Sequence, residues 1–260
     1  MGVKMIVCDL DGTLLRSDKT ISDYTLDMLE KCRKRDILLA FATARSQNGV
    51  GPYIDIMRPD ALVLNNGALA KIGDKVVYRA IIDVDTANRI LALMINHPEV
   101  GYITTETEDG YFVNHPIDEH ARYSYFKPVF TDFARGIRHD AYKIVPEITA
   151  AAAKAIAEPF PEITVTHLSG ETWRFFTHKD ATKLKGVAAA AKHLGIDLSH
   201  VMAFGDDYND IEMLTSCGIG VAMANAIPEA KAAADYICDD NDSDGVARWI
   251  DGNILNGGLL

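Results

Sequence analysis

Residues 6–14 read IVCDLDGTL, an apolar run that ends in two acids one position apart, followed by glycine and threonine. Asp9 and Asp11 stand at positions i and i+2, so on a strand their side chains point to the same side. They come at the carboxyl end of the predicted strand, where ligands bind in open α/β sheets, and Gly12 permits a tight turn there. Taken alone, the pair fits a ligand site and a solvated strand end equally well.

A second apolar run, VMAFGDDYND at 201–210, also ends in acids, namely Asp206, Asp207 and Asp210. Two strand ends can meet at one edge of a sheet, and carboxylates packed together there repel. Two unit charges about 4 Å apart interact by about 4 kcal/mol at an effective dielectric constant of about 20. A hard divalent cation relieves that repulsion, and Mg²⁺ prefers carboxylates together with phosphate oxygens. An acidic loop facing water leaves the repeated pattern unexplained.

Short apolar runs closed by polar or small residues predict further strands. Each is four to six residues long and apolar throughout, as in parallel sheets covered on both faces. Helical stretches lie between them, one opening after a predicted N-cap at Ser22 and running to about Arg35. This alternation predicts a Rossmann-like, doubly wound parallel α/β core. The predicted strands are Met5–Leu10, Ile37–Ala42, Ala61–Leu64, Val201–Phe204 and Ile219–Met223, and the other helices are 184–194 and 229–234.

The middle of the chain has a different pattern. YITTETEDGYFV at 102–113 has two β-rich runs joined through Asp109-Gly110, a short-turn signal. AYKIV, an Ala-rich helix at 148–157, ITVTHLS and TWRFFTH then predict a β-α-β-β order. We predict a discontinuous core domain of residues 1–81 and 180–260, interrupted by an inserted α+β domain at 82–179.

Composition limits the partners and the location. The chain has 260 residues with a net charge of −11, so a nucleic-acid partner is not expected, because such binding rests on a basic face. No apolar stretch is long enough for a membrane span, and the N-terminus does not resemble a signal peptide. Four separated cysteines without a CxxC pair favour reduced thiols and a cytoplasmic location. The sequence does not indicate an oligomeric state.

Four motifs resemble those of the haloacid dehalogenase superfamily. They are DLDGTLL (9–15), FATAR (41–45), a lysine at 183 and GDDYND (205–210), in order and with the expected gaps. GIGVAMANAIPEAKAAADYI (218–237), followed by DGV (244–246), resembles the Cof-type branch of sugar-phosphatase-like hydrolases with a type IIB cap. The resemblance covers both halves of the predicted core, and over the insert it is topological only.

The resemblance implies a role for each matching residue. Asp9 is the implied nucleophile, which forms an aspartyl-phosphate. Asp11 protonates the leaving oxygen and then activates the hydrolytic water, and a carboxylate pair can supply one ionised group and one proton carrier. The implied Mg²⁺ ligands are Asp9, the main-chain carbonyl of Asp11 and Asp206, with Asp210 as a ligand or directly behind them. The implied phosphoryl contacts are Thr43, the backbone of Leu10 and Ala44, Asn209, and Lys183, which neutralises charge.

Two positions depart from the family pattern. Ala44 replaces the usual glycine of Thr-Gly-Arg, and alanine resists positive φ. Relatives usually have Lys-Gly, which here occurs only at Lys185-Gly186. In the family, however, the lysine typically lies eleven residues before a Leu-Gly-Ile like Leu194–Ile196, and this resemblance selects Lys183. Two positions on a helix differ by about 200°, so one lysine alone faces the phosphate, and we favour Lys183.

Other candidates have weaker support. Residues 240–251, DNDSDGVARWID, match a calcium-loop pattern, but the preceding ADYIC predicts a strand, so we favour an acidic loop before a short helix. The aromatic residues Trp173, Phe175 and Phe176 can line a pocket or fill the core of the insert. Five histidines of the insert can contact substrate or simply lie on the surface: His97, His115, His120, His139 and His167.

These patterns favour a magnesium-dependent phosphatase that acts on small phosphomonoesters, such as sugar phosphates or similar phosphorylated metabolites. The insert is then a cap that closes over the site and excludes water. A phosphotransferase or phosphomutase shares the aspartyl-phosphate step and stays an alternative. A non-catalytic domain that binds a metal or a phosphorylated ligand is a third hypothesis, but it predicts a lost catalytic residue, and Asp9, Asp11, Asp206 and the lysine are all present.

Overall fold

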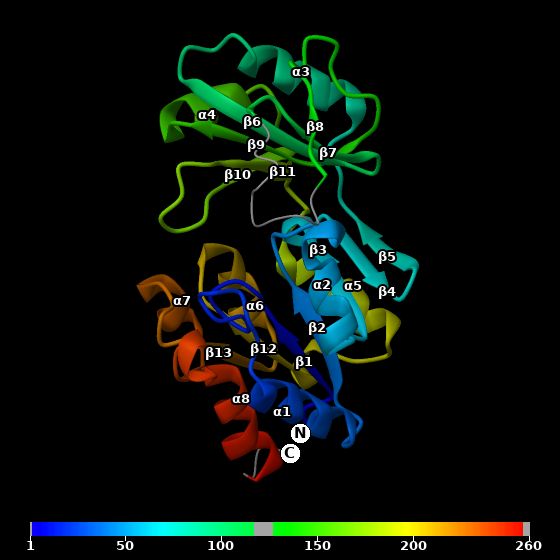
Figure 1. The fold of residues 1–260 in the computed structure, drawn as a ribbon, viewed down its shortest axis with the longest axis vertical. Coiled ribbons are helices and arrows are strands. Elements are labelled where there is room, and N and C mark those ends of the chain that lie inside the picture. Colours follow the sequence, from blue (N-terminus) through cyan, green and yellow to red (C-terminus); the bar gives the residue numbers. More distant parts are fainter. Residues whose placement is uncertain (1, 117–126, 257–260) are drawn as a thin grey trace.

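The computed structural model describes residues 2–116 and 127–256, which form two sheets, one above the other in Figure 1. The larger sheet has eight strands in the order β14-β13-β12-β1-β2-β3-β4-β5. The strands from β14 to β3 run parallel, and β4 and β5 add an antiparallel hairpin at one edge. They are β1 Met5–Cys8, β2 Leu38–Ala42, β3 Ala61–Leu64, β4 Leu69–Ile72, β5 Lys75–Arg79, β12 Val201–Gly205, β13 Ile219–Ala222 and β14 Tyr236–Ile237.

Helices pack against this sheet as predicted for a Rossmann-like core. Ser22 caps α1, accepting a hydrogen bond from Thr25 N through its side chain, and α5 packs against β3, β4 and β5. The sequence did not predict α2 or the β4–β5 hairpin. The helices are α1 Asp23–Arg33, α2 Gln47–Met57, α5 Lys183–His193, α6 Ile211–Ser216, α7 Pro228–Ala233 and α8 Gly245–Trp249.

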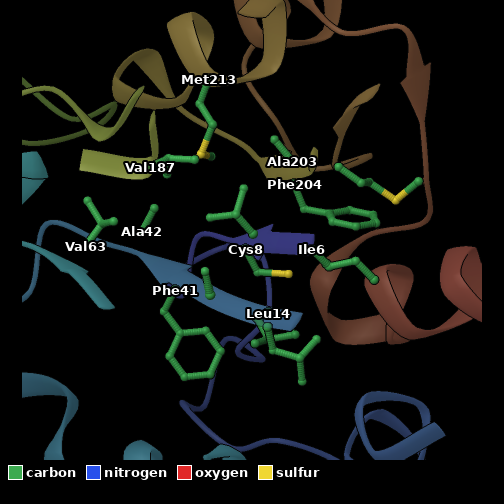
Figure 2. Close-up of a cluster of buried hydrophobic side chains, with 14 of the residues drawn as sticks. Ile6, Cys8, Leu14, Phe41, Ala42, Val63, Val187, Ala203, Phe204 and Met213 are labelled. Carbon is green, nitrogen blue, oxygen red and sulfur yellow. The ribbon is translucent and has the colours of Figure 1, made fainter. Parts of the chain in front are cut away.

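The centre of the core sheet is β1, which pairs in parallel with β2 on one side and β12 on the other. All four of its residues are buried, and Figure 2 shows Ile6 and Cys8 among side chains from β2 and β12. The ladder continues past the strand, because Asp9 N donates a hydrogen bond of 3.0 Å to Phe204 O. The fold therefore fixes Asp9 at the carboxyl edge of the sheet, beside the end of β12.

The second sheet has six strands in the order β10-β11-β9-β6-β7-β8. Figure 1 shows its helices, α3 and α4, on the side away from the core. Thr107 pairs with Gly110, so Glu108 and Asp109 form the hairpin turn, one position before the predicted one. The elements are α3 Val84–Met94, β6 Val100–Thr107, β7 Gly110–Val113, β8 Val129–Phe130, β9 Ala141–Ile148, α4 Ala150–Ala157, β10 Ile163–Thr166 and β11 Phe175–His178.

Each sheet has its own hydrophobic cluster. Ile82 packs into the cluster of the smaller sheet, and Ala181 packs into the cluster of the larger one. We therefore propose residues 82–179 as the limits of the inserted domain, in line with the sequence prediction. Within 2–116 and 127–256, no helix combines the length and apolar character needed to cross a membrane.

Helix α5 can approach the sheet closely because it carries a glycine where it meets β3. A Cβ built on Gly186 would lie 2.4 Å from Val63 Cγ1, well inside normal contact distance. Gly186 is one turn after the start of the helix, so this contact sets the depth of the first turn, which carries Lys183. In the Lys185-Gly186 pair, the glycine therefore serves the packing of α5 against β3.

We expect Gly186→Ala to lower the free energy of unfolding by about 1–3 kcal/mol, the usual cost of overpacking a core. Gly51→Ala is the matched control, because Gly51 lies in α2 and a Cβ added there would meet nothing within 4 Å; alanine there should be neutral or stabilise by up to about 1 kcal/mol. Denaturant unfolding of both variants measures the difference. Equal stability of the two would contradict this packing.

Candidate active site

Three buried side chains and the partly buried Asp206 meet at the carboxyl ends of β1 and β12, where one ammonium group joins two of the acids. Lys183 Nζ donates hydrogen bonds of 2.7 Å to Asp9 Oδ1 and 2.7 Å to Asp210 Oδ1. The Lys183 side chain is 1% exposed, and those of Asp9 and Asp210 are 8% and 0% exposed. One carboxylate oxygen of Asp206 lies within 4.8 Å of oxygens of the other two acids. Two acidic motifs about 200 residues apart along the chain are thus brought to one point.

The charges of this cluster do not balance. Burial lowers the pKa of Lys183, but Asp210 and Asp9 outweigh burial and raise it above the ordinary value, so the ammonium stays charged. Burial raises the pKa of Asp9, and Lys183 offsets part of that rise. Burial and the neighbouring Asp210 raise the pKa of Asp206 to about 7. One ammonium facing three carboxylates leaves room for a further positive charge.

The donor set fits a magnesium ion, because every nearby side-chain donor of Asp9, Asp206 and Asp210 is oxygen. Asp210 is the acid most engaged by the protein: Oδ1 accepts from Lys183, and Oδ2 accepts from the backbone N–H groups of Asp206 and Asp207 at 3.1 and 3.2 Å. Asp206 Oδ1 accepts a hydrogen bond of 2.7 Å from Thr13. Asp210 therefore orients the loop, while Asp9 and Asp206 are the acids best placed to meet a cation.

Gly12 is required by this arrangement. Its φ is +80°, and a Cβ there would lie 2.4 Å from Asp206 Oδ2. A side chain at this position would both strain the turn and displace the Asp206 carboxylate. The glycine after the two acids in IVCDLDGTL thus keeps the first acidic loop in contact with the second.

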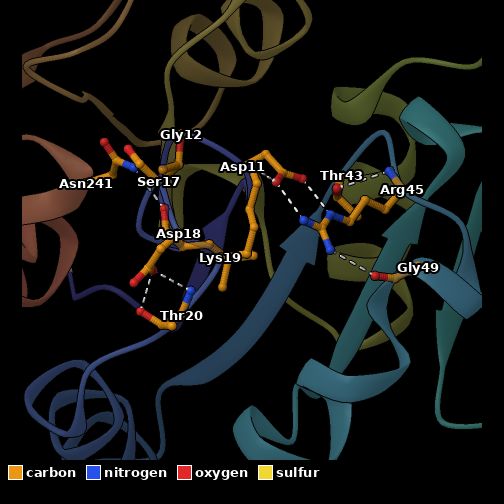
Figure 3. A network of polar contacts seen from close by, with 12 residues as sticks. Asp11, Gly12, Ser17, Asp18, Lys19, Thr20, Thr43, Arg45, Gly49 and Asn241 are labelled. Atoms are coloured by element: carbon orange, nitrogen blue, oxygen red, sulfur yellow. Dashed lines mark hydrogen bonds and ion pairs between the residues drawn. The ribbon is translucent and has the colours of Figure 1, made fainter. Parts of the chain in front are cut away.

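Asp11 does not join the cluster; its carboxylate points toward basic side chains (Figure 3). Arg45 Nε and Nη2 donate to its two oxygens at 2.6 and 2.7 Å, and Lys19 Nζ donates at 2.7 Å. Burial raises the pKa of Asp11, but Arg45 and then Lys19 outweigh burial and hold it below the ordinary value. The sequence singled out Arg45 only as part of a motif; its contact with Asp11 depends on how β1 and β2 pair.

Apart from Lys183, the predicted phosphate-contacting residues lie in the loops that follow β1, β2 and β12. Thr43 is buried, and its hydroxyl accepts a hydrogen bond of 3.1 Å from Arg45 N. Leu10 follows Asp9 and is buried. Ala44 does not have positive φ, so the substitution of alanine for glycine brings no backbone strain. Asn209 Nδ2 donates a hydrogen bond of 2.9 Å to Asn66 Oδ1.

The sequence interpretation missed Asn66, which holds both Asn209 and the Thr43 loop. Asn66 N donates a hydrogen bond of 3.0 Å to Thr43 O, and the residue is 5% exposed. The signal was present: Asn-Asn-Gly at 65–67 follows β3, a neighbouring strand end, with residues that tolerate positive φ. Asn66 has a φ of +60°.

Several sequence candidates lie elsewhere. Lys185 is 47% exposed and pairs with Asp180, so Lys183, as favoured from the spacing, is the lysine in the cluster. Phe176 is buried in the hydrophobic cluster of the insert. The acids of the 240–251 loop bind the N-terminal loop, Asp242 through Ser17 and Asp244 through Arg16. Within the described ranges, the group of three or more acids that meet at metal-ligand distance is Asp9, Asp206 and Asp210.

Of the insert histidines that the structure describes, one lines a cavity near the candidate site and three make other contacts. His115 lines a cavity next to Arg45, whereas His139 pairs with Glu108 and Asp109 in the hairpin turn. His97 accepts a hydrogen bond from Glu99 N. The ring of His167 packs against that of Tyr208, with 4.9 Å between the ring centroids. His120 lies outside the described residues.

The insert contacts the core directly at this edge. Lys143 Nζ of β9 donates a hydrogen bond of 2.7 Å to Ala44 O, and Ser169 N and Oγ donate to Asp207 Oδ2 at 2.9 and 3.0 Å. Asp207, counted from sequence among the clustered acids, therefore faces the insert. A cavity of about 410 Å³ lies between the two domains, with Arg45 on the core side and Glu106, Trp173 and Phe175 among the residues on the other.

The sequence profile of the haloacid dehalogenase-like hydrolases matches residues 6–250. This chain belongs to that family. It is 25% identical to the 5-amino-6-(5-phospho-D-ribitylamino)uracil phosphatase of Bacillus subtilis, over 95% of this chain and 96% of that protein. It is 26% identical to the pyridoxal phosphate phosphatase of Escherichia coli, over 98% and 100%. A solved sugar phosphatase of haloacid dehalogenase subclass IIB has a TM-score of 0.83 and 26% identity, over 96% and 98%.

Membership of the haloacid dehalogenase-like hydrolases confirms the resemblance predicted from the motifs, and the TM-score confirms the predicted fold class. From here on we call the smaller domain the cap.

We expect Lys183→Ala to destabilise the metal-free protein by about 3–5 kcal/mol, because removing one partner of a buried ion pair leaves its charges uncompensated. Lys185→Ala is the control, and its exposed pair should contribute nothing measurable. Chemical denaturation in the presence of a chelator measures both variants. A larger loss for Lys185→Ala than for Lys183→Ala would contradict the assignment.

Proposed function

We propose that this protein is a magnesium-dependent phosphatase that hydrolyses small phosphomonoesters through a phosphorylated Asp9. The observation that carries the proposal is the cluster of buried Asp9, Asp210 and Lys183 with the partly buried Asp206 at the carboxyl edge of the sheet. Relatives of near-equal length are phosphatases acting on a ribityl phosphate and on pyridoxal phosphate, which supports a small phosphorylated metabolite as the substrate.

In the first proposed step, an Asp9 carboxylate oxygen attacks phosphorus, and the bond between phosphorus and the leaving oxygen breaks. Asp11 gives a proton to that oxygen. In the second step, water attacks phosphorus, Asp11 takes a proton from the water, and the bond from phosphorus to Asp9 breaks. Phosphate leaves and Asp9 is regenerated, so both carboxyl groups end as they began.

In the free enzyme, the contacts of Asp11 favour its role in the second step, in which it accepts a proton from water. Arg45 and Lys19 stabilise its ionised form, which accepts a proton. Arg45 lines the cavity, so an anionic phosphoryl group that enters the site competes with Asp11 for its guanidinium group. The hydrogen bonds from Arg45 to Asp11 are then weakened. The proton affinity of Asp11 then rises when a substrate is present to receive the proton.

A bound Mg²⁺ would be held by Asp9 and Asp206, with Asp210 behind them and the Asp11 carbonyl as a further oxygen donor; it would supply the positive charge that offsets the carboxylates and the phosphoryl oxygens. Lys183 keeps Asp9 in place and adds charge beside it. Thr43, Asn209 and the backbone at Leu10 and Ala44 are the proposed contacts of the phosphoryl oxygens. These donors would stabilise the transition state more than the ground state.

The cap is proposed to close the site during the first step and to select the leaving group. The Lys143–Ala44 and Ser169–Asp207 hydrogen bonds join cap and core beside the catalytic loops, so opening the cap must break them. Exclusion of bulk water during attack by Asp9 follows from this closed arrangement.

We expect the purified protein to release inorganic phosphate from at least one member of a panel of phosphomonoesters, only when Mg²⁺ is present. Asp9→Asn should abolish release, because an amide is not a competent nucleophile, while the folded state persists by circular dichroism. The control Asp242→Asn changes an acid of the 240–244 loop that pairs with Ser17 and should retain turnover. An isomerised product without phosphate release would identify a phosphomutase instead. Full activity of Asp9→Asn would contradict the proposal.

We also expect Mg²⁺ to raise the melting temperature. A ligand at about 100 times its dissociation constant stabilises the folded state by about 2.7 kcal/mol. Asp206→Asn should remove most of this increase, whereas Asp242→Asn, in the acidic 240–244 loop, should keep it. Differential scanning calorimetry with and without Mg²⁺ makes the comparison, and an unchanged increase in Asp206→Asn would place the ion elsewhere.

A further inference from the structure

Two sequence motifs have no part in the proposed chemistry. They are the stretch 218–237, which resembles the Cof-type branch, and the acidic stretch 240–251 with its calcium-loop pattern. In the structure, one asparagine from each stretch hydrogen-bonds to a backbone carbonyl of the loop at residues 9–15, which follows β1 and is called the first acidic loop below. The two motifs therefore meet at the loop that carries Asp9 and Asp11.

Asn225 uses both ends of its amide group. Nδ2 donates a hydrogen bond of 2.7 Å to Gly12 O in the first acidic loop, and Oδ1 accepts one of 3.1 Å from Asn241 N. Two residues further along, Ile227 N donates a hydrogen bond of 2.9 Å to Asp206 O. The segment 225–227 is therefore bonded at once to the two loops that supply the clustered acids.

Asn241 holds the other end of the first acidic loop. Its Nδ2 donates a hydrogen bond of 2.9 Å to Leu15 O, and the residue is 7% exposed. Figure 3 shows Asn241 next to this loop. Because Asn225 in turn accepts a hydrogen bond from Asn241 N, the two asparagines form one connected pair that spans the loop from Gly12 to Leu15.

The turn at Gly12 needs such external support, because glycine restricts its own backbone least of all residues. A Cβ at this position would lie 2.4 Å from Asp206 Oδ2, so the close contact of the two loops excludes a stiffer residue. Gly12 also lies between two proposed Mg²⁺ donors: the Asp11 carbonyl precedes it in the chain, and the Asp206 carboxylate lies against it. A shift of Gly12 would therefore change the distance between these donors.

The surroundings of Asn225 favour a role in position over a role in overall stability. The side chain belongs to an exposed residue, and its two hydrogen bonds go to backbone atoms. An exposed hydrogen bond can be replaced by one to water, so its loss costs the fold little. Its direction toward the Gly12 carbonyl, by contrast, fixes one point of a loop that cannot fix itself.

We propose that Asn225 is a positioning residue for the Mg²⁺ site, which holds the Gly12 carbonyl so that the first acidic loop and Asp206 stay at the separation that a shared cation requires. Without this bond the two loops spend a smaller fraction of the time in the binding arrangement, and the apparent affinity for Mg²⁺ falls by the same factor. The inference rests on the proposed function for its Mg²⁺ site and is independent of which ester is cleaved.

The test titrates Mg²⁺ against the melting temperature of the full-length wild type, Asn225→Ala and the control Asn253→Ala. Asn253 is a matched control, because its Nδ2 also donates to a backbone carbonyl, that of Trp249 at 3.1 Å, in the helical segment Ile250–Leu255. Asn225→Ala should need roughly 5-fold more Mg²⁺ than wild type for the same increase in melting temperature, the effect of losing one ordinary hydrogen bond. Asn253→Ala should need the wild-type concentration.

Phosphate release from p-nitrophenyl phosphate at increasing Mg²⁺ is the second measurement. The half-saturating Mg²⁺ concentration should rise by the same factor in Asn225→Ala. Saturating Mg²⁺ should restore the wild-type rate, because the variant keeps every proposed ligand and every group that acts on the phosphoryl group. Loss of a residue that only supports the fold would not be reversed by excess metal in this way.

Three results would overturn the inference: an unchanged Mg²⁺ titration of Asn225→Ala, an equal shift in Asn253→Ala, or a loss of activity that saturating Mg²⁺ does not restore. In these outcomes the wild type still binds Mg²⁺ and releases phosphate, so the proposed function survives. A wild type that binds Mg²⁺ but releases phosphate from no ester would remove the proposed function, while the melting temperatures would still decide the role of Asn225. A wild-type melting temperature that does not respond to Mg²⁺ would remove both.

Discussion

The candidate active site depends on one buried ammonium group placed between two buried carboxylates. Without Lys183, three acids at the edge of the sheet would face one another in a region of low dielectric constant. The lysine needs a helix that starts at the end of the cluster and packs closely on the sheet, which Gly186 permits against Val63. It also needs β1 and β12 as neighbours, since they carry Asp9 and the Asp206–Asp210 loop.

The two halves of the site differ in their charge. Around Asp9, carboxylates outnumber the ammonium, and this side calls for a divalent cation. Around Asp11, Arg45 and Lys19 outnumber the carboxylate, and this side suits an anionic substrate. In the proposed function, a phosphomonoester that enters between them would meet positive charge from both sides once a metal is bound. A net charge of −11 for the whole chain does not prevent this, because distant charges are screened over about 8 Å at physiological ionic strength.

Local sequence patterns predicted those parts of the molecule that local rules determine. The buried strands ending in acids and the Ser22 cap are of this kind, whereas the choice of Lys183 over Lys185 came from the spacing typical of the family. The pairing of Glu106 with Lys143 was out of reach, because it depends on the register of strands far apart in the chain. The ion pair between Arg45 and Asp11 was equally unpredictable, because it depends on the pairing of β1 with β2. The β4–β5 hairpin, α2 and α3 were missed although their patterns are local. Asn66 was missed because an Asn-Asn-Gly turn is usually only a turn.

The central claim is that the Asp9 carboxylate, held by Lys183, becomes esterified to phosphorus during turnover. The most direct measurement is acid quenching of the enzyme during turnover of a ³²P-labelled phosphomonoester with Mg²⁺, followed by peptide mapping. The account predicts a hydroxylamine-sensitive label on the peptide that contains Asp9. A label on another residue, or rapid turnover with no labelled protein at any quench time, would contradict it.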